Sequence, residues 1–233
     1  MTSPPDDHAA TAAPEPLTIA QARVLGSLVE KEATTPDVYP LTANAVHLAC
    51  NQKTSRDPVL ALEPGEVGHA LRTLEARRLV AAVHGARAQR YEHRFAQAYS
   101  VTRQQQALLA MLLLRGPQTA SELMVRCERM APFEGVAQVR DVLDRLVQRT
   151  PALAINLGRA AGQREDRYMH LLCGPVAADQ AAPRAREPRG ERSDAEQPAR
   201  DEALAALQAR VEALEAAVRA LQGLPPDPGD DQP

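Results

Sequence analysis

The stretch CNQKTSRDP, residues 50–58, gathers amide, ammonium, hydroxyl, guanidinium and carboxylate groups into one short segment. One interpretation is an internally bonded loop, in which Arg56 pairs with Asp57 and short polar side chains accept backbone amides. The alternative is that Lys53, Ser55 and Arg56 point outward and bind a phosphate or an acidic partner surface. Under either interpretation, the segment begins the connection between two helices.

The same segment gives little support for catalysis. Lys53-Thr54 matches the end of a phosphate-binding P-loop, but the upstream glycines whose amides would cradle a phosphate are missing. Cys50 and His47 could form a thiolate–imidazole pair, yet Cys50 continues an apolar helical face, which predicts a buried, inert thiol. The three cysteines are scattered without a CxxC pair, which argues against a zinc site or a disulfide framework. We therefore predict no enzymatic activity, no metal and no cofactor.

Composition and charge narrow the class of protein. Aromatic residues make up only 3% of the 233 residues and Trp is absent, so aliphatic side chains must fill the core, which favours helices. The full chain carries a net charge of -3, but residues 18–175 hold 20 Lys and Arg against 15 Asp and Glu. The start of the chain is acidic and proline-rich, and no run of 18 apolar residues occurs. These features predict a cytoplasmic protein that does not associate with a membrane.

Both ends of the chain differ in composition from its middle. Residues 1–16 and 175–200 are rich in Pro, Ala and mixed charge, which predicts a disordered tail and a disordered linker. Residues 201–223 follow a heptad pattern and are expected to form a short coiled-coil helix, with residues 224–233 as a second disordered tail. The seam that would support a homodimer consists of Leu204, Leu207, Val211, Leu214, Val218 and Leu221.

The middle of the chain shows the same order of elements twice. Apolar spacing predicts helices over residues 20–32, 42–51 and 64–79, and again over 104–114, 119–130 and 136–147. A strand–turn–strand pattern follows each set, and the motif Arg-Tyr-x-His recurs at residues 90–93 and 167–170. Three helices followed by a hairpin are the plan of a winged helix. We therefore predict a mainly α fold with small β-hairpins (α+β), formed by two tandem winged-helix domains, 17–97 and 98–174.

Cationic side chains on the predicted wings and third helices are candidates for contacts with nucleic acid. Some could be neutralised locally, Arg94 by Glu92, and Arg164 and Arg167 by Glu165 and Asp166. The third helices carry both signs of charge, so neither is a strongly basic recognition helix. The full candidate set is Lys53, Ser55, Arg56, Arg72, Arg87, Arg90, Arg94, Arg140, Arg159, Arg164 and Arg167.

Several long phrases carry a resemblance to a known family: AQARVLGSLVEKE, TTPDVYPLTANAVHLACNQKTSRDPV, YEHRF, LLLRGPQTASEL and REDRYMHLL. In this order they resemble the YceH-like family of uncharacterised bacterial proteins, over about residues 17–173. The resemblance implies a tandem winged-helix fold and no settled biochemical activity. Two mild departures are Thr54, where a serine is common, and Ala86-Arg87-Ala88 in the first wing.

Two functions are compatible with these observations. The first is a DNA-binding, regulatory protein that uses both winged helices, with the heptad helix promoting self-association. The second is a non-enzymatic protein–protein interaction module of the kind found in chromosome-organising complexes, which the mixed-charge third helices and acidic ends favour. Architecture does not decide between them, because the same fold serves unrelated functions.

Overall fold

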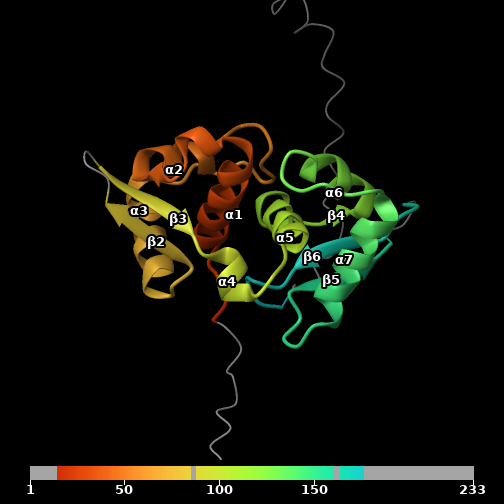
Figure 1. The fold of residues 1–233 in the computed structure, drawn as a ribbon. Helices are drawn as coiled ribbons and strands as arrows, with labels where there is room; N and C mark the ends of the chain where they lie inside the picture. Colours follow the sequence, from red (N-terminus) through yellow and green to blue (C-terminus); the bar gives the residue numbers. More distant parts are fainter. Residues whose placement is uncertain (1–14, 85–87, 160–162, 176–233) are drawn as a thin grey trace, which may run out of the picture. The chain divides into compact units, whose positions relative to one another are not determined.

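The computed structural model describes residues 15–84, 88–159 and 163–175, all of which fall in one compact unit. The linker, the heptad helix with its predicted seam, the second tail, most of the first tail and Arg87 lie outside the described residues. Helices and small antiparallel sheets together form the described chain, which confirms the α+β class (Figure 1).

The first repeat runs from α1 to α4. Its elements are α1 (Ile19–Thr34), the 3₁₀ helix η1 (Pro36–Val38), β1 (Leu41–Thr42), α2 (Ala43–Cys50), α3 (Pro64–Ala76), β2 (Val80–His84), β3 (Gln89–His93) and α4 (Phe95–Tyr99). The second repeat has α5 (Arg103–Arg115), β4 (Gln118–Thr119), α6 (Ala120–Cys127), α7 (Val136–Gln148), β5 (Ala154–Gly158) and β6 (Arg167–His170).

Threonine side chains define the starts of four helices. Thr18 and Thr102 form capping boxes with glutamines three residues later, and Thr42 and Thr119 cap α2 and α6. A capping hydroxyl accepts a backbone N–H that has no partner within the helix, so each threonine fixes where its helix begins. The repeats therefore share their helix starts as well as their order of elements.

Each repeat closes with a three-stranded antiparallel sheet, in the order β1-β3-β2 and β4-β6-β5. Tyr91 pairs with Leu41 in the first sheet, and Tyr168 pairs with Gln118 at the matching position of the second. The predicted hairpins are confirmed, while the two-residue strands, η1 and α4 were not predicted. Their short lengths leave too little periodicity for a sequence pattern to reveal them.

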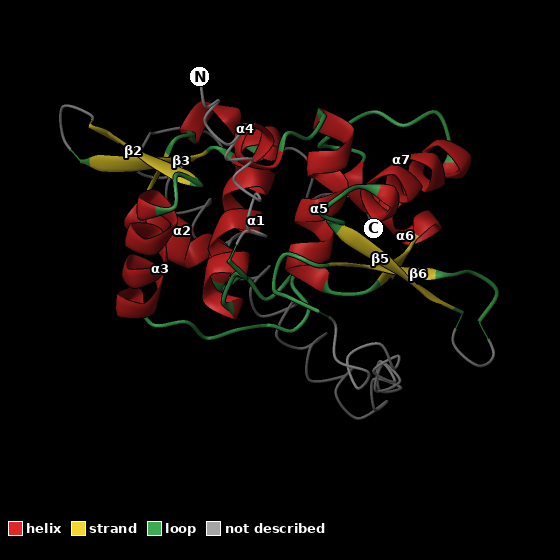
Figure 2. Cartoon of the chain, turned by 90° about the horizontal axis from the view of Figure 1, so that it is seen from below, coloured by secondary structure: helices red, strands yellow, loops and turns green. Residues whose placement is uncertain are grey.

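The two repeats share one hydrophobic core, and α1 packs against α5 at its centre. Figures 1 and 2 show these two helices side by side. Eight consecutive residues of α5, 107–114, are buried, which is why this helix shows no polar face over its last two turns. Gly26 lies where α1 approaches α5: a Cβ there would be 3.1 Å from Leu114 Cγ.

Candidate functional site

The polar loop after α2 is built around a buried ion pair. Arg56 Nη2 lies 2.6 Å from Glu30 Oε2, and Nη1 donates to Glu30 Oε1 at 3.1 Å, so the pair is bidentate. Nε and Nη2 of Arg56 also donate to the carbonyl oxygen of Ala49 at 3.1 and 2.8 Å. The Arg56 side chain has no exposed surface, and Glu30 on α1 is nearly as buried. This arginine joins α1 to the end of α2.

Other backbone and side-chain contacts fix the rest of the loop. Arg23 of α1 donates to the carbonyls of Cys50 and Pro58 at 3.1 and 2.6 Å. Asn51 exchanges two hydrogen bonds with the backbone of Leu62, at 2.8 and 2.9 Å, as a strand neighbour would. The Asp57 amide donates to the Leu114 carbonyl of α5 at 2.9 Å, which links the loop to the second repeat.

The predicted outward orientation of Arg56 is therefore wrong, and so is its pairing with Asp57. A guanidinium with a bidentate carboxylate and a helix-end carbonyl as partners is more stable buried than a local i, i+1 pair in water. Lys53 and Ser55 are exposed, as the binding interpretation requires. The structure thus combines the two interpretations: a bonded loop whose outer turn presents the Lys53 ammonium and the hydroxyl groups of Thr54 and Ser55.

The third helices present opposite charges at matching positions. Both have 13 residues, and their buried positions coincide: Val67, Ala70, Leu71 and Leu74 in α3, and Val139, Val142, Leu143 and Leu146 in α7. With 3.6 residues per turn, the centre of the exposed face lies opposite these residues. That centre carries His69 and Arg72 in α3 but Asp141 and Asp144 in α7, and all four are exposed. Glu66, which flanks the α3 centre, accepts from the Glu63 amide at the helix start.

The wing arginines also differ between the repeats. Arg90 donates to the carbonyls of Val38 and Pro40 at 3.3 and 2.7 Å and has no carboxylate partner within the described part of the chain. Arg94 pairs with Glu92 as predicted. In the second repeat, three candidate arginines form ion pairs: Arg140–Glu165 (3.5 Å), Arg159–Asp166 (3.3 Å) and Arg167–Glu122 (3.1 Å). The expected pairing of Arg167 with Glu165 or Asp166 is wrong, because Glu122 of α6 lies closer. Arg164 is exposed.

Two buried cysteines and a buried histidine are held neutral rather than activated. Burial raises the pKa of the Cys50 thiol to about 11 and that of Cys127 to about 12, so neither is a thiolate near neutral pH. Burial lowers the pKa of His170 to about 4. His93, at the matching position, accepts the Phe95 amide at Nδ1 and donates from Nε2 to Glu32 at 2.8 Å. This contact lowers the pKa of Glu32 and joins α1 to the start of α4.

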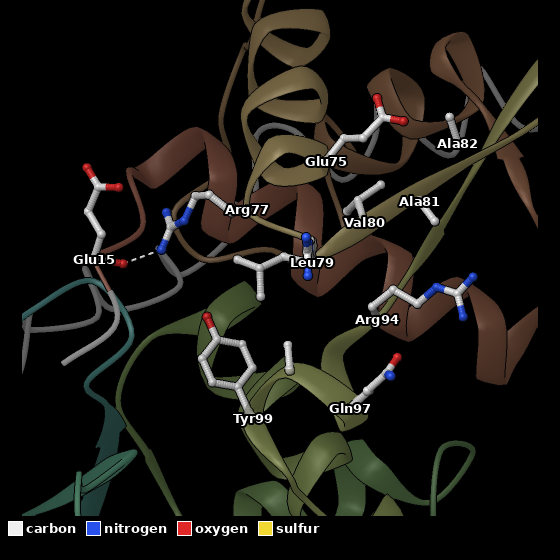
Figure 3. A pocket seen from close by; sticks show the side chains of 12 residues that line it. Glu15, Glu75, Arg77, Leu79, Val80, Ala81, Ala82, Arg94, Gln97 and Tyr99 are labelled. Carbon is white, nitrogen blue, oxygen red and sulfur yellow. Dashed lines mark hydrogen bonds between the residues drawn. The ribbon is translucent and has the colours of Figure 1, made fainter. Parts of the chain in front are cut away.

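A groove borders the first sheet and was not predicted. It has a volume of about 880 Å³ and is lined by the end of α3, β2, Arg94, residues of α4 and Glu15. Figure 3 shows Val80, Ala81 and Ala82 of β2 on one side and Gln97 and Tyr99 of α4 on the other, and we call it the β2 groove. The sequence signal nearest to this groove is the Arg77-Arg78 pair, which matches no binding motif.

The described residues contain neither a metal-ligand cluster nor a membrane-spanning helix. No group of three or more His, Cys, Asp and Glu side chains there is arranged to hold a metal ion. Within the same residues, no helix has both the length and the apolar character that crossing a bilayer requires.

Comparison with known proteins identifies the family. Residues 17–163 match the family described as "Protein of unknown function, DUF480". The chain belongs to this family. A UPF0502 protein of Stenotrophomonas maltophilia (strain K279a) is 53% identical over 207 residues, which cover 89% of this chain and 94% of the relative. A UPF0502 protein of Mesorhizobium japonicum is 53% identical over 198 residues, covering 83% and 94%.

A third relative, a UPF0502 protein of Xanthomonas euvesicatoria, is 59% identical over 174 residues, or 74% of this chain and 78% of the relative. The predicted membership of an uncharacterised bacterial family is confirmed. The DUF480 match contains the polar loop, α3 and the lining of the β2 groove except Glu15, so these features lie within the part of the chain that defines the family.

Proposed function

We propose that each repeat is a winged helix and that the chain is a cytoplasmic, regulatory DNA-binding protein which contacts DNA with its first repeat. The order helix, short strand, two helices and hairpin, present twice, supports the winged-helix assignment. In that architecture the second helix of the helix-turn-helix pair enters the major groove, which assigns this role to α3.

The charge difference between α3 and α7 carries the proposal. His69 and Arg72 occupy the centre of the exposed face of α3, where a recognition helix meets base edges and phosphates. Lys53 is exposed in the loop that precedes α3. Among the described residues, Arg90 on the wing is bonded only to carbonyl oxygens, so the charges of both side chains are available to phosphates. Asp141 and Asp144 at the centre of α7 would repel a phosphate backbone.

The test is binding of the full chain to a fluorescent duplex over a range of salt concentrations. Each phosphate contact contributes about 0.9 to the slope of log affinity against log salt. The Arg72→Ala and Lys53→Ala variants are each expected to weaken binding and to reduce that slope by about one contact. Arg145→Ala, which removes an exposed arginine from α7, is the matched control and should leave both quantities unchanged. Absence of binding at low salt, or equal losses in all three variants, would refute the proposal.

The second candidate is a protein-interaction role, favoured by the acidic centre of α7 and the carboxylate-paired arginines around it. A basic surface of another protein would complement Asp141 and Asp144. A partner captured from cell extract by the full chain should then be lost with Asp141→Lys and Asp144→Lys together. It should be retained with Arg72→Ala.

A further inference from the structure

The β2 groove runs along a free edge of the first sheet. Successive side chains of a strand point to opposite faces, yet the consecutive residues Val80, Ala81 and Ala82 all line the groove, and no residue of β3 does. A groove on one face would expose alternate residues of both strands. The sheet order β1-β3-β2 also places β2 outermost.

The backbone of this edge has no partner beyond β3 among the described residues. In the described chain, Val80–Val83 make no hydrogen bonds other than those of the ladder with β3. An edge strand directs alternate N–H and C=O groups away from its sheet, and proteins usually protect such edges with charge, proline or a bulge. The sequence VAAV contains none of these, and its pairing with β3 is regular.

The second repeat shows what a protected edge looks like. β5 occupies the same outer position, but its register shifts between Asn156 and Gly158, where the chain takes a positive φ of 73°. The Asn156 side chain there accepts the Gly158 amide at 2.7 Å and donates to Asp166 at 3.1 Å. The bulge and the attached charges block strand addition at this edge, and nothing equivalent exists on β2.

A strained arginine stands at the start of the open edge. Arg78 has a φ of 57°, and its amide bonds to the Glu75 carbonyl while the Leu79 amide bonds to the Leu74 carbonyl. This is the helix ending at which glycine is usual, because a residue with a Cβ is strained at a positive φ. The Arg78 guanidinium, which lines the groove, has no hydrogen-bond or ion-pair partner among the described residues. Strain retained at one residue is a reason to look for a role of its side chain.

Arg78 is the residue of the lining that could pair with a carboxylate of a bound segment. The lining contains three arginines, Arg77, Arg78 and Arg94, against two glutamates, Glu15 and Glu75. Arg94 is paired with Glu92 at 2.6 Å. Among the described residues, Arg77 donates only to uncharged acceptors, one of which is the Gln21 side chain at 3.2 Å. With Arg94 paired, Arg77 and Arg78 equal Glu15 and Glu75 in number, so the lining carries no net charge and its available cation is Arg78, which has no ion-pair partner among the described residues. Leu79, Val80, Ala98 and Tyr99 make the rest of the lining apolar.

We propose that the β2 groove binds an extended segment of another protein as an additional strand, with small apolar side chains along β2 and a carboxylate at Arg78. Strand addition supplies affinity through backbone hydrogen bonds and specificity through alternate side chains. Five residues of such a segment span about 17 Å, and the groove volume of about 880 Å³ is within the usual range for binding sites. The site is separate from the exposed face of α3 proposed for DNA.

The test uses a phage-displayed library of random twelve-residue peptides, selected against the full chain. Enriched sequences should combine an apolar stretch with at least one carboxylate. A synthetic copy of the best peptide should slow hydrogen exchange of the Val80 and Ala82 amides. These point away from β3, because Leu79 accepts from Arg94 and bonded pairs alternate along the ladder. N-methylation of one alternate set of peptide amides should abolish binding, whereas the other set should tolerate it, since only alternate residues of an added strand bond to β2.

Arg78→Gly is the decisive variant, because it removes the charge and relieves the left-handed strain, so the thermal midpoint should hold or rise. We expect it to weaken the peptide at least tenfold, while Arg145→Ala does not change the affinity. Failure to enrich peptides, protection elsewhere, or full affinity with Arg78→Gly would overturn the proposal. So would protection of the Val80 and Ala82 amides in the peptide-free chain that disappears on deleting residues 1–14 or on dilution, since the occupant would then be this chain itself.

Discussion

At the scale of single residues, Arg56 is expected to matter for stability rather than for ligand binding. Arg56→Ala leaves the buried Glu30 carboxylate without its partner, and breaking such a pair costs about 3–5 kcal/mol. Urea unfolding measures this loss. Lys53→Ala, three positions earlier and exposed, should change stability by no more than about 0.5 kcal/mol. A loss below about 1 kcal/mol in Arg56→Ala would contradict the ion-pair argument.

His170 is expected to make the stability depend on pH. Its pKa is about 4 in the folded protein and about 6.5 when unfolded, so between these values only the unfolded chain binds the proton. Stability is therefore complete above pH 6.5 and is lost as the pH falls, by about 2–3 kcal/mol at pH 4.5. Urea unfolding at pH 7 and 4.5 measures the difference. His170→Phe, which has no titrating ring, should show a smaller loss between these two pH values, and an equal loss would exclude this histidine as the cause.

At the scale of elements, the contact between α1 and α5 depends on a small residue. In Gly26→Val, the added methyl groups meet Leu113 and Leu114, whose nearest atoms lie 3.1–3.2 Å from a Cβ. Overpacking of this kind costs about 1–3 kcal/mol. Gly68→Ala in α3 is the control, because its Cβ meets only the flexible end of Arg72 at 3.5 Å. It should gain about 0.5–1 kcal/mol through helix propensity. Thermal unfolding should show a lower midpoint for Gly26→Val and a higher midpoint for Gly68→Ala.

At the scale of the whole molecule, the heptad seam that begins at Leu204 predicts self-association. Removal of residues 198–233 should convert an oligomer into a monomer, because the apolar a and d positions would be lost. Light scattering of the full chain and of residues 1–197 gives both masses. An unchanged mass would assign any oligomer to another surface, with the β2 edge as the first one to examine.

The sequence by itself determined the features that depend on neighbours along the chain. Apolar periodicity located six helices to within a few residues, the two hairpins followed from their turns, and the repeated order of elements revealed the duplication. These predictions succeed because helix formation and capping are governed by residues three or four positions apart. Long matched phrases also placed the chain in its family.

Only the tertiary structure decided which charges are available. Arg56 finds its carboxylate 26 residues away on α1, and Arg167 finds Glu122 on α6, contacts that local spacing cannot anticipate. The same holds for the open edge of β2, because its exposure depends on which strand lies outermost in the sheet. Burial and strand order are properties of packing between distant segments. The sequence therefore identified the candidate cations, whereas the fold determined which of them are exposed and unpaired.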